Sequence, residues 1–163
     1  MLRLSRHLLA AHLDYQLENN EHETNLVAAF KKHTELENKN IVPYAVQGSS
    51  KLLNLFNEEY HQGITVTCPG FYAPQGRVVR ANLQFPQLVE KLSSFQFENH
   101  RVTNFEMETS AIFGLGRVFG HHCLAVNTIV ANRVRKEFTK DGAKSIEHMI
   151  QKSLEILSSS DDV

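Results

Sequence analysis

The chain has 163 residues, 42% of them hydrophobic and 21% charged, a balance typical of a single globular domain with a sizeable core. Because 17 Lys and Arg residues stand against 18 Asp and Glu residues, no net basic field favours nucleic acid or a membrane surface as a partner. The longest apolar runs fall well short of the ~20 residues that span a bilayer. We therefore expect one domain over residues 1–163.

The N-terminal stretch MLRLSRHLLAAHLDYQ interleaves its basic residues with its leucines, whereas a secretory signal places the basic residues first. The two cysteines, Cys68 and Cys123, do not have the spacing of a metal site. Together these features predict a cytoplasmic protein with reduced thiols.

The next segments predict a helix, a strand and a second helix. ETNLVAAFKKH (23–33) has apolar residues at helical spacing and basic residues at its end, as an amphipathic helix does. IVPYAVQ (41–47) is strand-like. Ser49 then stands where a serine can cap a helix over residues 49–61.

The middle of the chain predicts another strand and helix. GITVTC (63–68) is rich in β-branched residues and is bounded by turn residues, so it reads as a strand. Residues 83–95 predict a helix, with Pro86 tolerated in its first turn.

The last third continues the alternation of strands and helices. Residues 101–120 change from β-like to helix-like composition around Glu106. The apolar, β-branched centre of residues 121–133 predicts a buried strand, and residues 145–157 predict an amphipathic helix. Such alternation predicts an α/β fold with helices on both faces of its sheet, and ligands in such folds gather where loops leave the strand ends.

The stretch FYAPQGR (71–77) lies at one of these strand exits. A turn needs Pro or Gly for its backbone, but it does not need an amide and a guanidinium two residues apart. One interpretation is a solvated loop in which Arg77 makes a surface ion pair. In the other, Gln75 and Arg77 hydrogen-bond the edge of a pyrimidine while Phe71 or Tyr72 stacks on its face.

NFEMETS (104–110) lies at the second strand exit. One interpretation is a helix start, with Asn104 as the cap and the carboxylates of Glu106 and Glu108 in the first turn. If the stretch is extended, the two carboxylates share a face, which permits a two-carboxylate glycosidase. The remaining alternative is that one carboxylate binds a ribose diol while Met107 packs against the sugar.

Three further patterns carry less chemistry. GLGRVFG (114–120) lacks the spacing and the preceding strand of a dinucleotide loop, so its small residues predict close helix packing. Residues 121–123, His-His-Cys in tandem, do not suit a metal site. Asn132 and Arg133 directly follow the predicted strand and are placed to brace a site there.

From Gly63 onward, GITVTCPGFYAPQGR, NFEMETSAIFGLG and TIVANR together resemble the nucleoside phosphorylase family, in its uridine phosphorylase branch. The resemblance implies a mixed central β-sheet with helices on both faces. It also implies a uracil pocket at the aromatic–Gln–Arg turn and a ribose site at Glu-Met-Glu, and the ending ANR favours a pyrimidine over a purine. The substrate-binding residues that it implies are Phe71, Gln75, Arg77, Glu106, Met107, Glu108, Val130 and Arg133.

The activity implied is that of a pentosyltransferase in pyrimidine salvage: uridine and phosphate give uracil and ribose 1-phosphate. Gln75 and Arg77 are the implied catalytic pair, since preorganised donors stabilise a departing uracil anion. The resemblance implies no metal and no cofactor, with phosphate as co-substrate, and a homo-oligomer in which a neighbouring subunit completes each site.

The sequence departs from the family pattern at the phosphate site. The family binds phosphate with a Gly-rich loop and arginines from its N-terminal part, and these 163 residues contain no such loop. We therefore expect an N-terminally truncated, C-terminal portion of the fold: a fragment, a misplaced gene start or a degenerate copy. The functional alternatives are a purine nucleoside phosphorylase, a hydrolytic nucleosidase, and an inactive nucleoside-binding or assembly domain.

Overall fold

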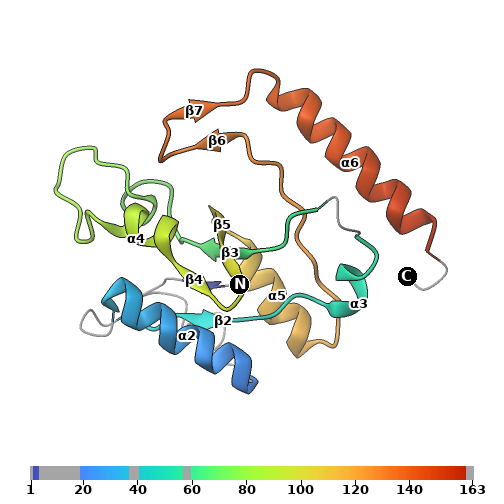
Figure 1. The fold of residues 1–163 in the computed structure, drawn as a ribbon, viewed down its shortest axis with the longest axis horizontal. Helices are drawn as coiled ribbons and strands as arrows, with labels where there is room; N and C mark the ends of the chain where they lie inside the picture. The colour runs from blue at the N-terminus through green and yellow to red at the C-terminus, as the bar shows by residue number, and fades with distance from the viewer. Residues whose placement is uncertain (1, 4–18, 37–40, 57–59, 161–163) are drawn as a thin grey trace.

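A computed structural model describes residues 2–3, 19–36, 41–56 and 60–160 (Figure 1). Its main sheet has five strands in the order β2-β1-β3-β5-β4. The central pairs, β1 with β3 and β3 with β5, are parallel, while β2 and β4 add antiparallel edges. The sheet is therefore mixed, as expected. The strands are β1 (Leu2–Arg3), β2 (Tyr44–Ala45), β3 (Ile64–Thr67), β4 (Gln96–Phe97) and β5 (His100–Glu106).

Helices lie on both faces of this sheet, which confirms the α/β prediction. α2 and α4 pack on one face and contribute to the same hydrophobic cluster, and α5 packs on the other face against β3. α6 runs apart from the strands, beyond the small β6–β7 hairpin (Figure 1). The elements are α2 (Glu21–Thr34), α3 (Ser50–Leu53), α4 (Leu88–Ser94), α5 (Thr109–Val118), β6 (Ala131–Asn132), β7 (Glu137–Phe138) and α6 (Gly142–Ser158).

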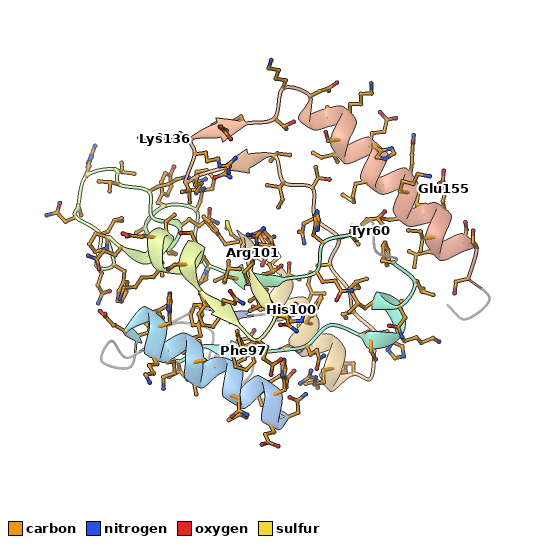
Figure 2. The ribbon with its side chains drawn as sticks, viewed as in Figure 1. Tyr60, Phe97, His100, Arg101, Lys136 and Glu155 are labelled. Carbon is orange, nitrogen blue, oxygen red and sulfur yellow. The ribbon has the colours of Figure 1, made fainter. Side chains whose placement is uncertain are left out.

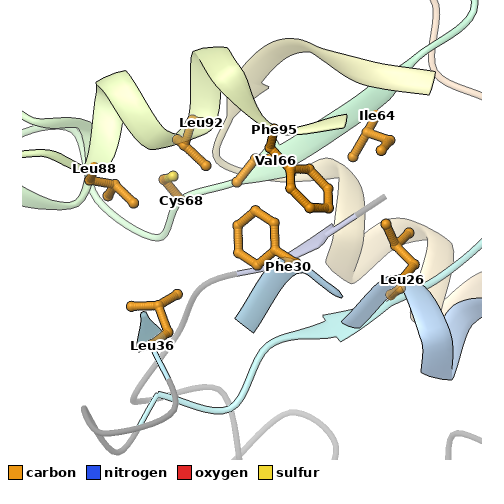
Figure 3. Packing of buried hydrophobic residues seen from close by; sticks show 10 residues of the cluster. Leu26, Phe30, Leu36, Ile64, Val66, Cys68, Leu88, Leu92 and Phe95 are labelled. Carbon is orange, nitrogen blue, oxygen red and sulfur yellow. The ribbon is translucent and has the colours of Figure 1, made fainter. Parts of the chain in front are cut away.

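The core forms where α2 and α4 meet β3. Strand side chains alternate between faces, so Ile64, Val66 and the following Cys68 all face this cluster. Phe30 of α2 meets Phe95, next to the end of α4, edge-to-face with ring centroids 5.1 Å apart (Figure 3). Because both rings are almost fully buried, they supply much of the apolar area that drives folding of this region.

The predicted helix at 23–33 is confirmed as α2, and the capping box at its start also anchors it to the fold. Asn20 Oδ1 accepts from the Glu23 amide at 2.8 Å, and Glu23 Oε2 accepts from the Asn20 amide at 3.0 Å. The buried Glu23 carboxylate also receives the two Nη groups of Arg117 from α5, at 2.7 and 2.5 Å, and the Gln47 amide at 2.6 Å. Burial opposes ionisation, but these donors outweigh it and lower the pKa of Glu23.

Three predicted elements are present but shorter than predicted. The first two are the strand at 41–47 and the helix from Ser49, and the third is the helix at 83–95. The strand at 41–47 is reduced to Tyr44–Ala45, which pair with Arg3 and Leu2 of β1. The predicted helix from Ser49 has its serine cap, with Leu52 N donating to Ser49 Oγ at 3.3 Å, but α3 ends at Leu53. It buries no side chain, so little packing supports a longer helix. Residues 57–59 lie outside the described part.

The predicted helix at 83–95 begins only at Leu88. Pro86 therefore precedes the helix instead of occupying its first turn, in keeping with the bias of a residue before proline against helical backbone. The helix predicted at 145–157 is confirmed and starts three residues earlier, because the Asp141 carboxylate caps it by accepting from Lys144 N at 3.3 Å.

The buried strand predicted at 121–133 is wrong. Residues 121–130 form no strand, and only Ala131–Asn132 pair, in β6 with β7. Residues 124–127 instead line one side of a cavity of about 490 Å³, opposite Ile64 and Thr103 at the start of β3 and within β5.

Glycine lets this segment approach α5 closely, as the small residues of 114–120 predicted. A Cβ added to Gly116 would lie 2.3 Å from Cys123 Sγ, so a larger residue there would force the Cys123 side chain to move. After Cys123, none of the described side chains is buried. Lys136 in the β6–β7 turn and Glu155 on α6 both lie at the periphery, whereas Phe97, His100 and Arg101 lie where β4 pairs with β5 (Figure 2).

Candidate functional site

Two loops meet at the carboxyl ends of the neighbouring parallel strands β3 and β5. Thr67 pairs with Glu106 in the register of these strands, and the Cys68 amide donates to the Glu106 carbonyl at 2.7 Å. The first loop carries residues 71–77 and the second carries residues 106–109. Both predicted motifs therefore lie at the sheet edge where α/β proteins bind ligands.

The 71–77 turn has a tightly defined backbone. Residues 73–75 form one turn of 3-10 helix, and Gly76 closes it with a φ of 73°, a left-handed conformation that favours glycine. A Cβ on Gly76 would lie 2.6 Å from Val89 Cγ2, so α4 packs directly on the turn. The result is that Gln75 is buried, at 6% exposure, while Arg77 is half-buried beside it.

Gln75 is the centre of a cluster with two guanidinium groups. Its Oε1 accepts from Arg77 Nη1 at 2.7 Å and from Arg133 Nη2 at 3.0 Å, and its backbone oxygen accepts from Arg133 Nη1 at 3.0 Å. Because guanidinium groups only donate, they fix the amide with its oxygen toward the arginines. The two N–H donors on Nε2 are the end of the amide left to meet a ligand.

Two exposed aromatics stand at the start of this turn. Phe71 and Tyr72 are 52% and 60% exposed, and their rings meet at right angles with centroids 5.3 Å apart. The Arg77 guanidinium lies over one face of Phe71, 3.6 Å from the ring centroid, and donates to the Phe71 carbonyl. A flat ligand can therefore stack only on the other face of Phe71 unless Arg77 moves.

Glu106 ends β5 and caps α5. Its Oε1 accepts from Thr67 Oγ1 at 2.5 Å, and its Oε2 accepts from the amides of Glu108 and Thr109, both at 2.7 Å. The helix-start interpretation was wrong about Asn104, which lies within β5 and accepts from Thr65 Oγ1 at 2.7 Å, and wrong about the carboxylates, since Glu106 ends β5 and Glu108 precedes the first turn of α5. Asn104 is in a paired strand, two residues too early to reach the free amides of α5.

The two carboxylates of this loop therefore have different surroundings. Burial favours the neutral form of Glu106, but hydrogen bonds from Thr109 and Thr67 outweigh it and lower the pKa of Glu106. Both of its oxygens are taken and it stays ionised, which does not suit a glycosidase general acid. Glu108 is exposed, and its carboxylate accepts from Met107 N at 3.2 Å through Oε2. It is the carboxylate available to a ligand.

The predicted site residues thus fall into two groups. Gln75, Arg77 and Arg133 share one hydrogen-bonded cluster, and Glu106 to Glu108 form the adjacent loop. Val130 is 39% exposed just before β6, and its carbonyl accepts from Thr139 N, so it joins neither group. None of Gln75, Arg77 and Glu108 lines the 490 Å³ cavity, which lies toward the opposite end of β3.

Sequence reasoning missed Thr67, Thr109 and Ser110. Thr67 is fully buried, donates to Glu106 and accepts from Ser110 N at 3.0 Å. The signal was present in the strand ITVT, where a hydroxyl at every second position marks a polar face on a buried strand. Burial, with the Glu106 carboxylate nearby, also raises the pKa of the adjacent Cys68 thiol to about 12.

Two other classes of feature were sought among the described residues. No group of three or more His, Cys, Asp or Glu side chains is arranged to hold a metal ion in the described ranges. Within those same ranges, no helix combines the length and the apolar character needed to cross a bilayer.

Comparison with known proteins identifies relatives of this chain. Residues 8–158 match the model of the phosphorylase superfamily. A curated uridine phosphorylase from Thermococcus kodakarensis is 36% identical over 103 residues, which are 63% of this chain and 36% of that protein. A solved structure, Trypanosoma brucei nucleoside phosphorylase, described as showing uridine phosphorylase activity, superposes with a TM-score of 0.80 at 25% identity. It covers 98% of this chain, which spans 56% of that protein.

Proposed function

This chain belongs to the phosphorylase superfamily, and we propose that its site serves the phosphorolysis of uridine to uracil and ribose 1-phosphate. The match covers 36% of the length of the curated relative and 56% of the solved structure. The proposal therefore concerns the base and ribose contacts that these residues supply. No residue here is assigned to phosphate.

The orientation of the Gln75 amide is the observation that carries the proposal. With Oε1 held by Arg77 and Arg133, the Nε2 donors are not used by the two guanidinium groups, and the exposed Phe71 ring lies in the same turn. Uracil has carbonyl acceptors on its edge and a flat face, so both features suit it. Arg77 covers one face of the Phe71 ring, which leaves the other face for the base.

The same groups suit the chemistry of the step. Phosphate oxygen attacks the anomeric carbon as the bond from that carbon to uracil N1 breaks, and the bonding electron pair leaves with the base. Donors from Gln75 and the guanidinium of Arg77 stabilise the developing uracil anion. Glu108 accepts from the ribose hydroxyls and fixes the sugar's orientation, while Met107, 37% exposed, packs against it.

The proposal extends to the setting of the reaction. We place it in nucleoside salvage in the cytoplasm, with phosphate as the co-substrate, without metal or cofactor, and in a homo-oligomer. Cys68 and Cys123 are both free thiols, which supports a reducing compartment.

The test uses uridine turnover with and without phosphate, together with calorimetric binding of uracil. Arg77→Ala should lower turnover by ~10²-fold or more, the loss typical of removing an oxyanion donor. Arg80→Ala is the matched control, since Arg80 is an exposed arginine three residues along the same loop. Ribose 1-phosphate that forms only with phosphate supports the proposal.

The other outcomes separate the alternatives. Free ribose would identify a hydrolytic nucleosidase, and preferential cleavage of inosine a purine phosphorylase. Uracil binding that Arg77→Ala abolishes, without turnover at high phosphate, would identify a nucleoside-binding domain. Wild-type protein that binds neither uracil nor uridine would overturn the site itself.

A further inference from the structure

One buried hydroxyl connects three elements beneath the second loop. Thr67 ends β3, is 0% exposed, and donates from Oγ1 to Glu106 Oε1 at the end of β5. The same Oγ1 accepts from the amide of Ser110 in the first turn of α5, at 3.0 Å. The hydroxyl therefore uses its donor and an acceptor, one toward each neighbouring element.

Packing alone does not require a hydroxyl at this position. The neighbouring Val66, on the other face of β3, is equally buried and wholly apolar. A buried hydroxyl is favourable only when it is hydrogen-bonded, and an isosteric valine would leave a Glu106 oxygen without this donor. Thr65, two residues earlier on the same face of β3, makes a similar bond by donating to Asn104 Oδ1 at 2.7 Å. Asn104 lies within β5 and is not part of the loop at 106–109.

Glu106 transmits the position of Thr67 to the residues that face a ligand. While Oε1 is bonded to Thr67, Oε2 receives the amides of Glu108 and Thr109, each at 2.7 Å. These two bonds define the backbone at Glu108, the available carboxylate. The Gln75 cluster is held by different contacts, to Arg77 and Arg133.

We infer that Thr67 is a positioning residue for the ribose-facing half of the site, acting through Glu106 to orient Glu108. This rests on the proposed function for its ligand, a ribonucleoside. The separation of the two clusters gives it a distinctive consequence. Loss of the Thr67 hydroxyl weakens binding of the nucleoside while leaving binding of the free base unchanged.

The experiment compares uridine and uracil affinities by calorimetry for the wild type, Thr67→Val, Thr67→Ser and Thr65→Val. Thr67→Val keeps the shape and removes the hydroxyl, so we expect uridine affinity to fall about tenfold, the effect of losing one well-made hydrogen bond. Uracil affinity should stay within about twofold. Thr67→Ser restores the hydroxyl and should restore uridine affinity, and Thr65→Val should behave like the wild type.

A second measurement follows the loop without a ligand. Thr67→Val should speed hydrogen exchange at the amides of Glu108 and Thr109, which depend on Glu106, while exchange at Gln75 stays unchanged.

Each failure has its own meaning. Equal losses for uracil and uridine in Thr67→Val, no loss for either, or the same loss in Thr65→Val would overturn the positioning role alone. Wild-type protein that binds uracil but shows no preference for uridine would do the same. Wild-type protein that binds neither ligand would overturn both this role and the proposed function.

Discussion

The chain contains two regions that differ in how many side chains they bury: a closed region before Arg117, and an open region from Arg117 to Ser160. The region before Arg117 holds every member of the hydrophobic cluster, from Leu26 to Phe95. Among the described residues from Arg117 to Ser160, none is buried. Yet α6 in this second region repeats apolar residues at four-residue spacing, and they are 41 to 61% exposed: Ile146, Ile150 and Leu154. An apolar pattern specifies the face to be covered, but burial also needs a surface that covers it.

The candidate site lies where the two regions meet. Gln75 and Arg77 belong to the first region, and Arg133 in the β6–β7 hairpin belongs to the second. The Arg133 guanidinium also lies 5.0 Å from the centroid of the Phe105 ring. The open region is therefore attached at the site by polar contacts that converge on one buried amide.

The largest expected effect is a loss of stability when a cavity is made in the closed region. Phe30→Ala should lower the free energy of unfolding by about 3–5 kcal/mol, because the ring is fully buried against Phe95. Urea unfolding followed by circular dichroism measures it. Phe138→Ala is the matched control, since Phe138 is 80% exposed, and comparable losses in both variants would erase the contrast between the regions.

The second effect concerns the ion pair between α2 and α5. Arg117→Met leaves the Glu23 carboxylate, 1% exposed, without its guanidinium partner. We expect a loss of about 2–3 kcal/mol, below the cost for a fully buried pair because the Arg117 side chain is 31% exposed. The double variant with Glu23→Gln should recover part of the loss. A loss no greater than that of an exposed arginine, such as Arg101→Met, would contradict this.

The third effect is a dependence of stability on acid. The pKa values of Glu23 and Glu106 lie below the usual 4.5 in the folded chain, because their hydrogen bonds outweigh burial. A carboxyl group whose pKa is lowered by folding adds stability at pH values above its pKa in the unfolded chain. This stability is lost as the pH falls through its pKa in the folded chain. The urea midpoint should drop on acidification below about pH 4.5, and less steeply in Glu23→Gln. A flat profile would contradict both assignments.

The smallest effect is expected in the open region. Ile150→Gln on α6 should change the free energy of unfolding by no more than about 0.5 kcal/mol, the range of ordinary surface substitutions. The same urea titration measures it, with Phe30→Ala as the contrasting variant. A larger loss that grows with protein concentration would mean that this face is covered in solution by another copy.

Local signals predicted the presence and type of the elements of the first region, but not the length of three of them. The capping residues of α2 and the β-branched run of β3 act within a few residues, so their structures follow from the sequence. The change from strand to helix was also placed correctly, next to Glu106. Pairing partners are not local, which is why β2 is shorter than its pattern and why residues 121–130 form no strand.

One grouping within the candidate site could be predicted, but its internal arrangement could not. The family resemblance assigned residues 75, 77 and 133 to one site, and the structure brings these three side chains together. Nothing in the sequence indicates that Oε1 of Gln75 faces the arginines, or that Glu106 is used up as a cap while Glu108 is left available. Those outcomes depend in part on hydrogen bonds between segments far apart in the sequence, such as Thr67 with Glu106 and Arg133 with Gln75. The ligand roles of these residues stay predictions.

The placement of the two sulfur atoms makes the chain its own reporter of unfolding. Cys68 is wholly enclosed and its pKa of about 12 leaves almost no thiolate at neutral pH, whereas Cys123 is partly exposed. A thiol-specific reagent should therefore modify Cys123 first and reach Cys68 only when β3 separates from the helices beside it. Counting modified thiols over time gives the opening rate of the closed region, with no label added.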